Sequence, residues 1–217
     1  MPEIYQMKSN IKVIAIHGLM GHGKDTAGQI LAKNLRHKGI KVFNLRFAMA
    51  VKQCASIMTG EELQITDNCS YDLPQLDFTR EQKQKFLPVW EMTLGQFLQR
   101  FATEAVRDGL HEDAWIRTIQ STIESEKMNH LIGGNNAVFI ITDFRFPNEK
   151  IWLNSVDAVT IKINRPFKEE KEKRETSHSS EKGLPDEEFD FVIQNNSTLD
   201  LFQEEIEKLS SVLNLFE

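Results

Sequence analysis

The feature that most constrains how this chain can fold is a glycine-rich loop. A continuous apolar run precedes it, and a segment with apolar residues at helical spacing follows it. Gly18, Gly23 and Lys24 have the spacing GxxxxGK. Residues 11–17, before the loop, form a nearly continuous apolar run rich in β-branched side chains, which is typical of a strand buried on both faces. Residues 24–37 carry apolar side chains at helical spacing. We therefore expect the loop to join a buried strand to a helix.

Such a loop is suited to binding phosphate groups. Glycines let the backbone turn so that successive N–H groups point toward phosphate oxygens, and the following helix N-terminus adds unpaired donors and partial positive charge. The Lys24 ammonium is expected to contact the β- and γ-phosphates of a nucleoside triphosphate and to act in catalysis. The predicted nucleotide-binding residues of the loop are Gly18, Gly21, His22, Gly23, Lys24, Asp25 and Thr26.

Asp25 occupies the position where this loop usually carries the Ser or Thr that ligates Mg²⁺, and Thr26 follows it. A carboxylate beside a triphosphate is repelled unless positive charge lies between them. We therefore expect Asp25 and Thr26 to serve as metal ligands, with Asp25 contacting Mg²⁺ directly or through water, or Asp25 to face the acceptor of the phosphoryl group. The alternative is that Asp25 only stabilises the first turn through the helix dipole.

Strands alternate with helices along the chain, which predicts an α/β fold with a parallel sheet of about five strands flanked by helices. Further strands are expected at 41–47, 137–142, 158–164 and 189–193, and further helices at 48–58, 94–107, 113–128 and 199–213. We interpret residues 1–217 as one domain. Within it, the polar segment 61–92 is expected to be an irregular insertion on the substrate side, and the charged segment 165–186 a lid-like segment.

Asp143 and Arg145 directly follow the strand expected at 137–142. The carboxyl ends of strands line the ligand crevice of an open α/β sheet, so both side chains should face the phosphate loop. An aspartate here is suited to positioning Mg²⁺ or the acceptor, and an arginine to stabilising charge on the transferred phosphoryl group. We therefore predict that both are catalytic, the alternative being an ion pair that closes a turn.

Other cations lie in segments that are candidates for substrate binding, namely Lys52, Arg80, Arg100 and Arg107. Each alone is most simply a solvated surface charge, but beside a phosphate loop at least one is expected to clamp an acceptor phosphate by bidentate hydrogen bonds. Arg100 and Arg107 should share one face of a helix. In the lid-like segment, Arg165 or Arg174 would be delivered to the phosphates on closure, unless the segment is only a solvated loop.

The charge balance limits the partners that this chain can have. Its formal net charge of -6 argues against a nucleic acid polymer, because such binding depends on Lys and Arg meeting phosphates. No window approaches the roughly 20 apolar residues of a membrane span, and the N-terminus lacks the pattern of a signal peptide. We expect a cytoplasmic protein with neither a membrane nor a nucleic acid polymer as partner, and leave a homodimer open.

Several short segments together resemble phage-type deoxynucleoside monophosphate kinases, a family of the P-loop nucleoside monophosphate kinase superfamily. They are GKDT at 23–26, FAxxxK at 47–52, DFTRE at 77–81, LQRFATEAVR at 98–107, DAW at 113–115, TDFRFPNE at 142–149, RP at 165–166 and HSSE at 178–181. The resemblance implies a P-loop kinase-like fold, ATP and Mg²⁺ at the loop, and transfer of the γ-phosphoryl group of ATP to a deoxynucleoside monophosphate.

The resemblance also implies roles for particular residues. It implies substrate contacts for Lys52, Arg80, Gln99, Thr103 and Arg107. It further places Asn195 near the adenine of the nucleotide. The chain departs from the family at Gly95, where many relatives have Arg, so the residue that grips the acceptor phosphate is not identified.

Other functions remain open at this stage. Dephospho-coenzyme A kinases and animal-type phosphomevalonate kinases are similar in having a phosphate loop, a small α/β core and a mobile lid. A regulatory module that binds ATP without transferring its phosphoryl group is a second class. Asp143 and Arg145 together with the basic lid-like segment favour transfer to a second substrate, and the acidic balance disfavours a DNA-end kinase.

Overall fold

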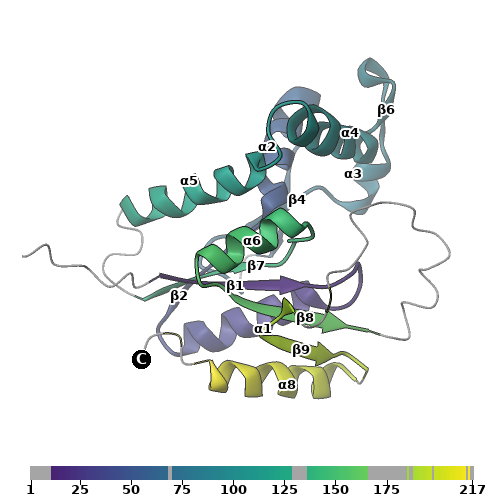
Figure 1. Cartoon of the computed structure of the whole chain (residues 1–217). Coiled ribbons are helices and arrows are strands. Elements are labelled where there is room, and N and C mark those ends of the chain that lie inside the picture. The colour runs from purple at the N-terminus through teal and green to yellow at the C-terminus, as the bar shows by residue number, and fades with distance from the viewer. Residues whose placement is uncertain are drawn as a thin grey trace, which may run out of the picture.

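The computed structural model describes residues 11–67, 70–128, 136–165, 185, 188–196, 198–213 and 215. Its centre is a five-stranded parallel sheet with the order β2-β7-β1-β8-β9 (Figure 1). The strands are β1 Ile11–His17, β2 Lys41–Leu45, β7 Ala137–Ile141, β8 Val159–Asn164 and β9 Phe191–Gln194. The prediction of a parallel α/β sheet of about five strands is confirmed.

Helices cover both faces of this sheet. In Figure 1, α1 and α8 lie on one face, and α5 and α6 lie on the other. The helices around the sheet are α1 Lys24–His37, α2 Phe47–Thr59, α5 Ala114–Met128, α6 Pro147–Ser155 and α8 Leu199–Val212. None of the described helices is long and apolar enough to cross a membrane.

The side chains of β1 alternate between two hydrophobic clusters because both faces of the sheet are covered. Val13 and Ala15 pack in the cluster that includes side chains of α2, α5 and α6. Ile14 and Ile16 pack in the cluster that includes side chains of α1 and α8. Both sets must be apolar, which explains why this strand is a continuous apolar run in the sequence.

The segment 61–92, predicted to be an irregular insertion on the substrate side, is not irregular, because it contains several short elements. β3 (Gln64–Asp67) pairs antiparallel with β4 (Gln75–Asp77), and β5 (Phe86–Leu87) pairs antiparallel with β6 (Met92–Thr93). Between the two hairpins lies α3 (Arg80–Gln84). Elements of two to five residues are too short to show a hydrophobic period, which is why the sequence pattern missed them.

Two capping boxes start the helices of this region. The Thr79 hydroxyl accepts from the Gln82 N–H at 3.1 Å, and the Gln82 side chain accepts from the Thr79 N–H at 2.8 Å. Thr93 and Gln96 make the same reciprocal pair at the start of α4 (Leu94–Arg100). The pattern Thr-x-x-Gln is the local signal that locates both helix starts.

The helix predicted over 94–107 changes its geometry halfway. After α4 the chain continues as a π-helix, η2 (Phe101–Asp108), whose i→i+5 hydrogen bonds widen the turn. As a result Arg107 lines a cavity, whereas Arg100 is exposed and lines none of the cavities described below. The expectation that Arg100 and Arg107 share one face is therefore wrong.

His17, the last residue of β1, is buried beneath the loop in its neutral form. Its Nδ1 donates to the carbonyl of Phe144 at 3.1 Å, and its ring packs against the rings of Phe144 and Phe189. The pKa of His17 is lowered to about 4, mainly by burial; the hydrogen bond to Phe144 opposes this decrease, and the nearby cations Lys162 and Lys24 contribute to it. The protein therefore prefers His17 unprotonated.

We expect this burial to make stability fall with acidification. The unfolded chain takes up a proton at His17 near pH 6.5, but the folded chain does not until about pH 4, so stability is lost as the pH falls through that window. Between pH 7 and pH 5 the loss in free energy of unfolding should be about 2 kcal/mol. Urea unfolding at both pH values measures it. His17→Gln should remove most of the pH dependence, and an unchanged dependence in that variant would contradict the assignment.

Candidate active site

The strand order brings the ends of five strands to one edge of the sheet. The glycine-rich loop follows the central strand β1. Arg46 and Thr142 follow β2 and β7 on one side of it, and Arg165 and Asn195 follow β8 and β9 on the other. The loop therefore lies between two groups of polar side chains that the sequence separates widely.

The conformation of the loop requires glycine at position 23. Gly23 has φ 98°, and a Cβ on it would lie 2.8 Å from Asn195 Nδ2. The same amide donates to the carbonyl of His22 at 2.9 Å. Asn195 is buried, and its side-chain amide holds the backbone of the loop in place.

The His22 side chain points away from the loop interior. It is buried, and its Nδ1 donates to the carbonyl of Ile163 on β8 at 3.2 Å. Gly18 approaches the same carbonyl, because a Cβ there would lie 2.9 Å from it. Any contact of His22 with a nucleotide would therefore come from its backbone, while the imidazole fastens the loop to the sheet.

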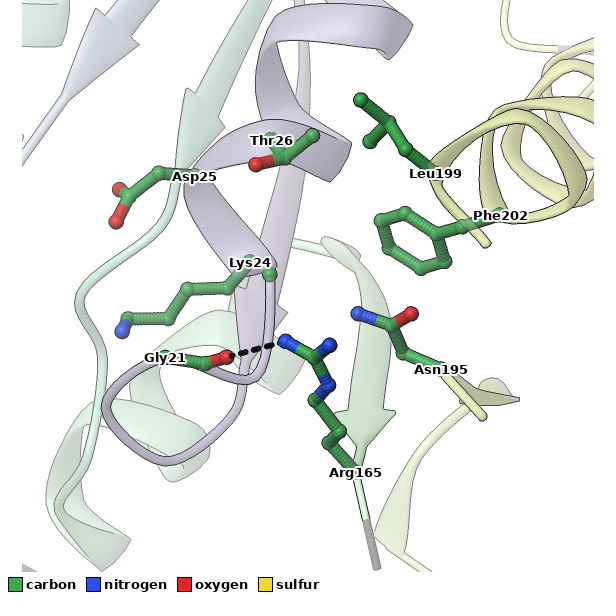
Figure 2. Close-up of a pocket in the computed structure, with 9 residues that line it drawn as sticks. Gly21, Lys24, Asp25, Thr26, Arg165, Asn195, Leu199 and Phe202 are labelled. Atoms are coloured by element: carbon green, nitrogen blue, oxygen red, sulfur yellow. Dashed lines mark hydrogen bonds between the residues drawn. The ribbon is translucent and has the colours of Figure 1, made fainter. Parts of the chain in front are cut away.

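On one side of the loop is a cavity of about 300 Å³, which we call the α8-side cavity. Its lining residues are Gly21, Gly23, Lys24, Asp25, Thr26, Arg165, Asn195, Leu199 and Phe202 (Figure 2). Arg165 donates to the carbonyl of Gly21 at 3.4 Å, as drawn in Figure 2. The cavity thus combines the helix N-terminus and a cation with the apolar side chains Leu199 and Phe202 from α8.

On the other side is a cavity of about 500 Å³, which we call the α2-side cavity. Its polar and charged lining residues are Lys24, Asp25, Arg46, Lys52, Asp77, Lys83, Thr103, Arg107, Thr142, Asp143, Arg145 and Glu149. Lys24 and Asp25 line both cavities, and Figure 2 shows them extending away from the α8 side chains. A group bound in one cavity would therefore meet a group bound in the other at these two residues.

Lys24 and Arg145 are the cations lining the α2-side cavity that pair with no acidic side chain of the described residues. Neither side chain makes a hydrogen bond or ion pair with the described residues, although the Lys24 side chain is buried and Arg145 is half-buried. Burial lowers the pKa of Lys24, and neighbouring Asp25 partly offsets this. A buried cation without a partner is costly, which indicates a place for an anion.

Asp25 is tied to the α2 side through one oxygen. Its Oδ1 accepts from the Thr142 hydroxyl at 2.9 Å and from the Arg46 guanidinium at 3.2 Å. Within the described residues Oδ2 makes neither a hydrogen bond nor an ion pair, and the side chain is 56% exposed. Arg46 supplies the positive charge that a carboxylate needs beside an anion-binding loop.

Asp143 holds the start of α2. Its Oδ1 accepts from the N–H of Phe47, and its Oδ2 accepts from the N–H of Ala48, both at 3.0 Å. These are the first two residues of α2, whose N–H groups have no partner inside the helix. The Asp143 carboxylate therefore acts as a cap supplied from β7, and the structure shows no ion pair between Asp143 and Arg145 in the described residues.

Asp77, at the end of β4, gathers three cations. Its Oδ2 accepts from Lys52 Nζ at 2.7 Å and from Arg46 at 3.3 Å, and its Oδ1 accepts from Lys83 Nζ at 2.9 Å. Burial acts to raise the pKa of Asp77, but the ion pairs with Lys52 and Lys83 bring it below its ordinary value. Burial lowers the pKa of Lys52. Lys52, for which a substrate contact was predicted, thus lines the α2-side cavity as part of an ion cluster.

Arg107 is held on a buried carboxylate. It donates to Glu149 at 2.9 Å and lies 3.7 Å over the ring of Phe146. Glu149, 2% exposed, also accepts from the backbone N–H of Arg145 at 2.7 Å and of Phe146 at 3.0 Å. This network fixes the turn between β7 and α6 and with it the position of Arg145.

The remaining predicted substrate residues are divided by the structure. Thr103 lines the α2-side cavity, whereas Arg80 and Gln99 are exposed and line neither cavity. Arg174 and most of the lid-like segment 165–186 fall outside the described residues. Arg46, Asp77, Lys83 and Glu149 were not predicted. The strand predicted over 41–47 included Arg46, so the strand-end rule did not select it, whereas in the structure β2 ends at Leu45 and Arg46 follows it.

A family model described as deoxynucleotide monophosphate kinase matches residues 36–206. The match begins after the glycine-rich loop, so the assignment of the loop depends on its own geometry. No curated protein gives a significant match to the chain.

Solved structures resemble the chain weakly. The APS kinase CysC of Mycobacterium tuberculosis in complex with AMPPNP and APS is 10% identical with a TM-score of 0.45, covering 92% of this chain and 97% of that one. Shikimate kinase from Bacteroides thetaiotaomicron is 14% identical with a TM-score of 0.42, covering 94% and 99%. The crystal structure of APE1195 is 15% identical with a TM-score of 0.44, covering 93% and 96%.

Proposed function

Because the chain belongs to the deoxynucleotide monophosphate kinase family, we propose that it transfers the γ-phosphoryl group of ATP to a deoxynucleoside monophosphate. In this proposal ATP binds in the α8-side cavity with its phosphates on the loop, and the acceptor binds in the α2-side cavity. The observation that carries the proposal is that Lys24 and Asp25 line both cavities, so donor and acceptor would meet at the first turn of α1.

The cations at this meeting point fit the charge of the reaction. Phosphoryl transfer depends mainly on positioning and on stabilising charge on the transferred group. Lys24 and Arg145 have no partner among the described residues, so both are free to contact phosphoryl oxygens. In this proposal Lys24 binds the β- and γ-phosphates and Arg145 stabilises the group in transfer. Asp143 positions α2 through its backbone rather than acting on the substrate.

The adenine end of the nucleotide has a site of matching chemistry. Leu199 and Phe202 offer an apolar surface in the α8-side cavity, and Asn195 lies beside them with its amide on the loop. Arg165 lines the same cavity and would contact the phosphates in this proposal. Asn195 would therefore act on the nucleotide indirectly, by holding the loop that binds the phosphates.

The residues at the loop also suit Mg²⁺, the cofactor expected with ATP. Mg²⁺ takes oxygen ligands and is usually held by one or two carboxylates together with substrate phosphates. Asp25 Oδ2 has no partner among the described residues, and Thr26 lines the α8-side cavity. When bound, Mg²⁺ would supply positive charge to the phosphates at this point. Asp25 and Thr26 would hold it.

The proposal is tested by incubating the purified protein with ATP, Mg²⁺ and each deoxynucleoside monophosphate, and following formation of the diphosphate. Turnover with at least one of them, and weaker turnover with the matching ribonucleotide, is the expected result. Dephospho-coenzyme A and phosphomevalonate serve as competing acceptors in the same assay. Turnover with either of these and none with deoxynucleotides would show that the proposed acceptor is wrong. ATP binding without any transfer would instead favour a regulatory module.

A further inference from the structure

We propose that Lys83, on the short helix α3, binds the phosphate group of the acceptor by leaving its ion pair with Asp77. The inference deepens the proposed function, because it assumes that a phosphorylated acceptor enters the α2-side cavity. Sequence reasoning instead assigned Arg80 of the same helix to substrate. The structure places Arg80 outside the cavity and Lys83 in its wall.

The other cations of the cavity are already committed. Arg46 donates to Asn44, Asp25, Gln75 and Asp77. Arg107 is bound to Glu149 and Asn148. If Lys24 and Arg145 serve the transferred group, an acceptor phosphate carrying about −1.5 to −2 charge needs a further cation.

Lys83 can leave Asp77 more readily than the other two cations. Its side chain is 39% exposed, against 10% for Lys52 and 13% for Arg46. Asp77 would remain bonded after Lys83 left, because Oδ2 keeps Lys52 and Arg46 and Oδ1 keeps the N–H of Phe78 at 2.7 Å. If Lys83 exchanges the Asp77 carboxylate for an acceptor phosphate, neither Lys83 nor Asp77 is therefore left as an unpaired charge.

Gly95 packs closely against the backbone of Lys83. A Cβ at position 95 would be 3.0 Å from the carbonyl oxygen of Lys83 and 3.9 Å from its Cβ. The N–H of Leu94 donates to the carbonyl of Lys85 at 3.0 Å, which fastens the end of α3 to the start of α4. A side chain at position 95 would require the Lys83 carbonyl to shift by a few tenths of an ångström, so glycine at this position favours the observed packing of α3 on α4.

The test compares three single substitutions in the full-length protein. Lys83→Met removes the ammonium and keeps an unbranched side chain, and Arg80→Met tests the competing candidate. Lys85→Met is the matched control, because Lys85 is an exposed lysine of the same region that pairs with Glu61 and lines neither cavity. KM and kcat are measured for the deoxynucleotide and for ATP, and circular dichroism checks that each variant folds.

We expect Lys83→Met to raise KM for the acceptor by about tenfold to a hundredfold, the usual effect of losing a hydrogen bond to a charged group. KM for ATP should change by less than about twofold, and Lys83→Arg should recover part of the loss, since a guanidinium also binds phosphate. Lys85→Met should behave as wild type. A normal acceptor KM in Lys83→Met, or a large rise in Arg80→Met alone, would overturn the proposal.

A separate binding measurement distinguishes this inference from the proposed function. Without ATP, a deoxynucleoside monophosphate and inorganic phosphate should each raise the thermal unfolding midpoint of the wild type, and should raise it less in Lys83→Met. If the wild type transfers to no deoxynucleotide but shows this difference, the acceptor is wrong and the role of Lys83 stands. If neither ligand stabilises the wild type, the role of Lys83 is overturned as well.

Discussion

Replacing Lys24 with methionine is expected to lower kcat by about a thousandfold, in the range seen when a cation or donor that stabilises the transferred or developing charge is removed. The Lys24 side chain is buried at the point where the two cavities meet and has no partner among the described residues. A buried positive charge without a partner is what the proposed contact with phosphate requires. Methionine preserves the unbranched side chain, so the packing of α1 on the sheet should survive.

The same variant, although impaired in kcat, should be no less stable than wild type in the absence of nucleotide. Burial lowers the pKa of Lys24, which means that the empty site disfavours the charged ammonium. Lys24→Met should therefore unfold at a temperature equal to or above that of wild type, while losing most of the stabilisation that ATP gives to wild type. Differential scanning fluorimetry with and without ATP and Mg²⁺ measures both. A variant that is less stable without nucleotide and equally stabilised by ATP would show that Lys24 has a structural role instead.

The part of the site that could be predicted from the sequence is local. Strand, turn and helix of the phosphate loop occupy consecutive residues, and Gly18, Gly23 and Lys24 are recognisable by spacing alone. Asp143 and Arg145 were found because the end of a buried strand is a position that the sequence shows. The motif resemblance over the rest of the chain is confirmed by the family model that matches residues 36–206.

The part that could not be predicted depends on contacts between distant segments. Asp77 meets Lys52 and Arg46 because β4 lies against α2, and strands as short as β3 and β4 have no detectable period. The π-helix η2 likewise cannot be recognised from apolar residues at α-helical spacing. Assuming a regular α-helix through this segment therefore placed Arg100 on the same face as Arg107. The capping role of Asp143 was missed for the same reason, because its partners are the N–H groups of Phe47 and Ala48 on another element.

Arg145→Ala is the second substitution with a large expected effect, a fall in kcat of about a thousandfold. The Arg145 guanidinium lines the α2-side cavity and has no partner among the described residues, so it is available to charge that develops during transfer. KM values for ATP and for the acceptor should change little, because an interaction made only in the transition state affects kcat. Its backbone N–H, bonded to Glu149 at 2.7 Å, is retained in the variant, so the turn after β7 should keep its shape.

Asp143→Ala is the contrasting variant from the same turn. It removes the cap from the first two N–H groups of α2, which should lower the free energy of unfolding by about 1–2 kcal/mol. Because α2 carries Lys52 into the α2-side cavity, the proposed acceptor site, displacement of α2 should raise the acceptor KM more than it lowers kcat. Chemical denaturation and steady-state kinetics on both variants separate the two roles. If Arg145→Ala instead showed the stability loss and raised KM expected of Asp143→Ala, Arg145 would act by holding the turn and not by contacting the phosphoryl group.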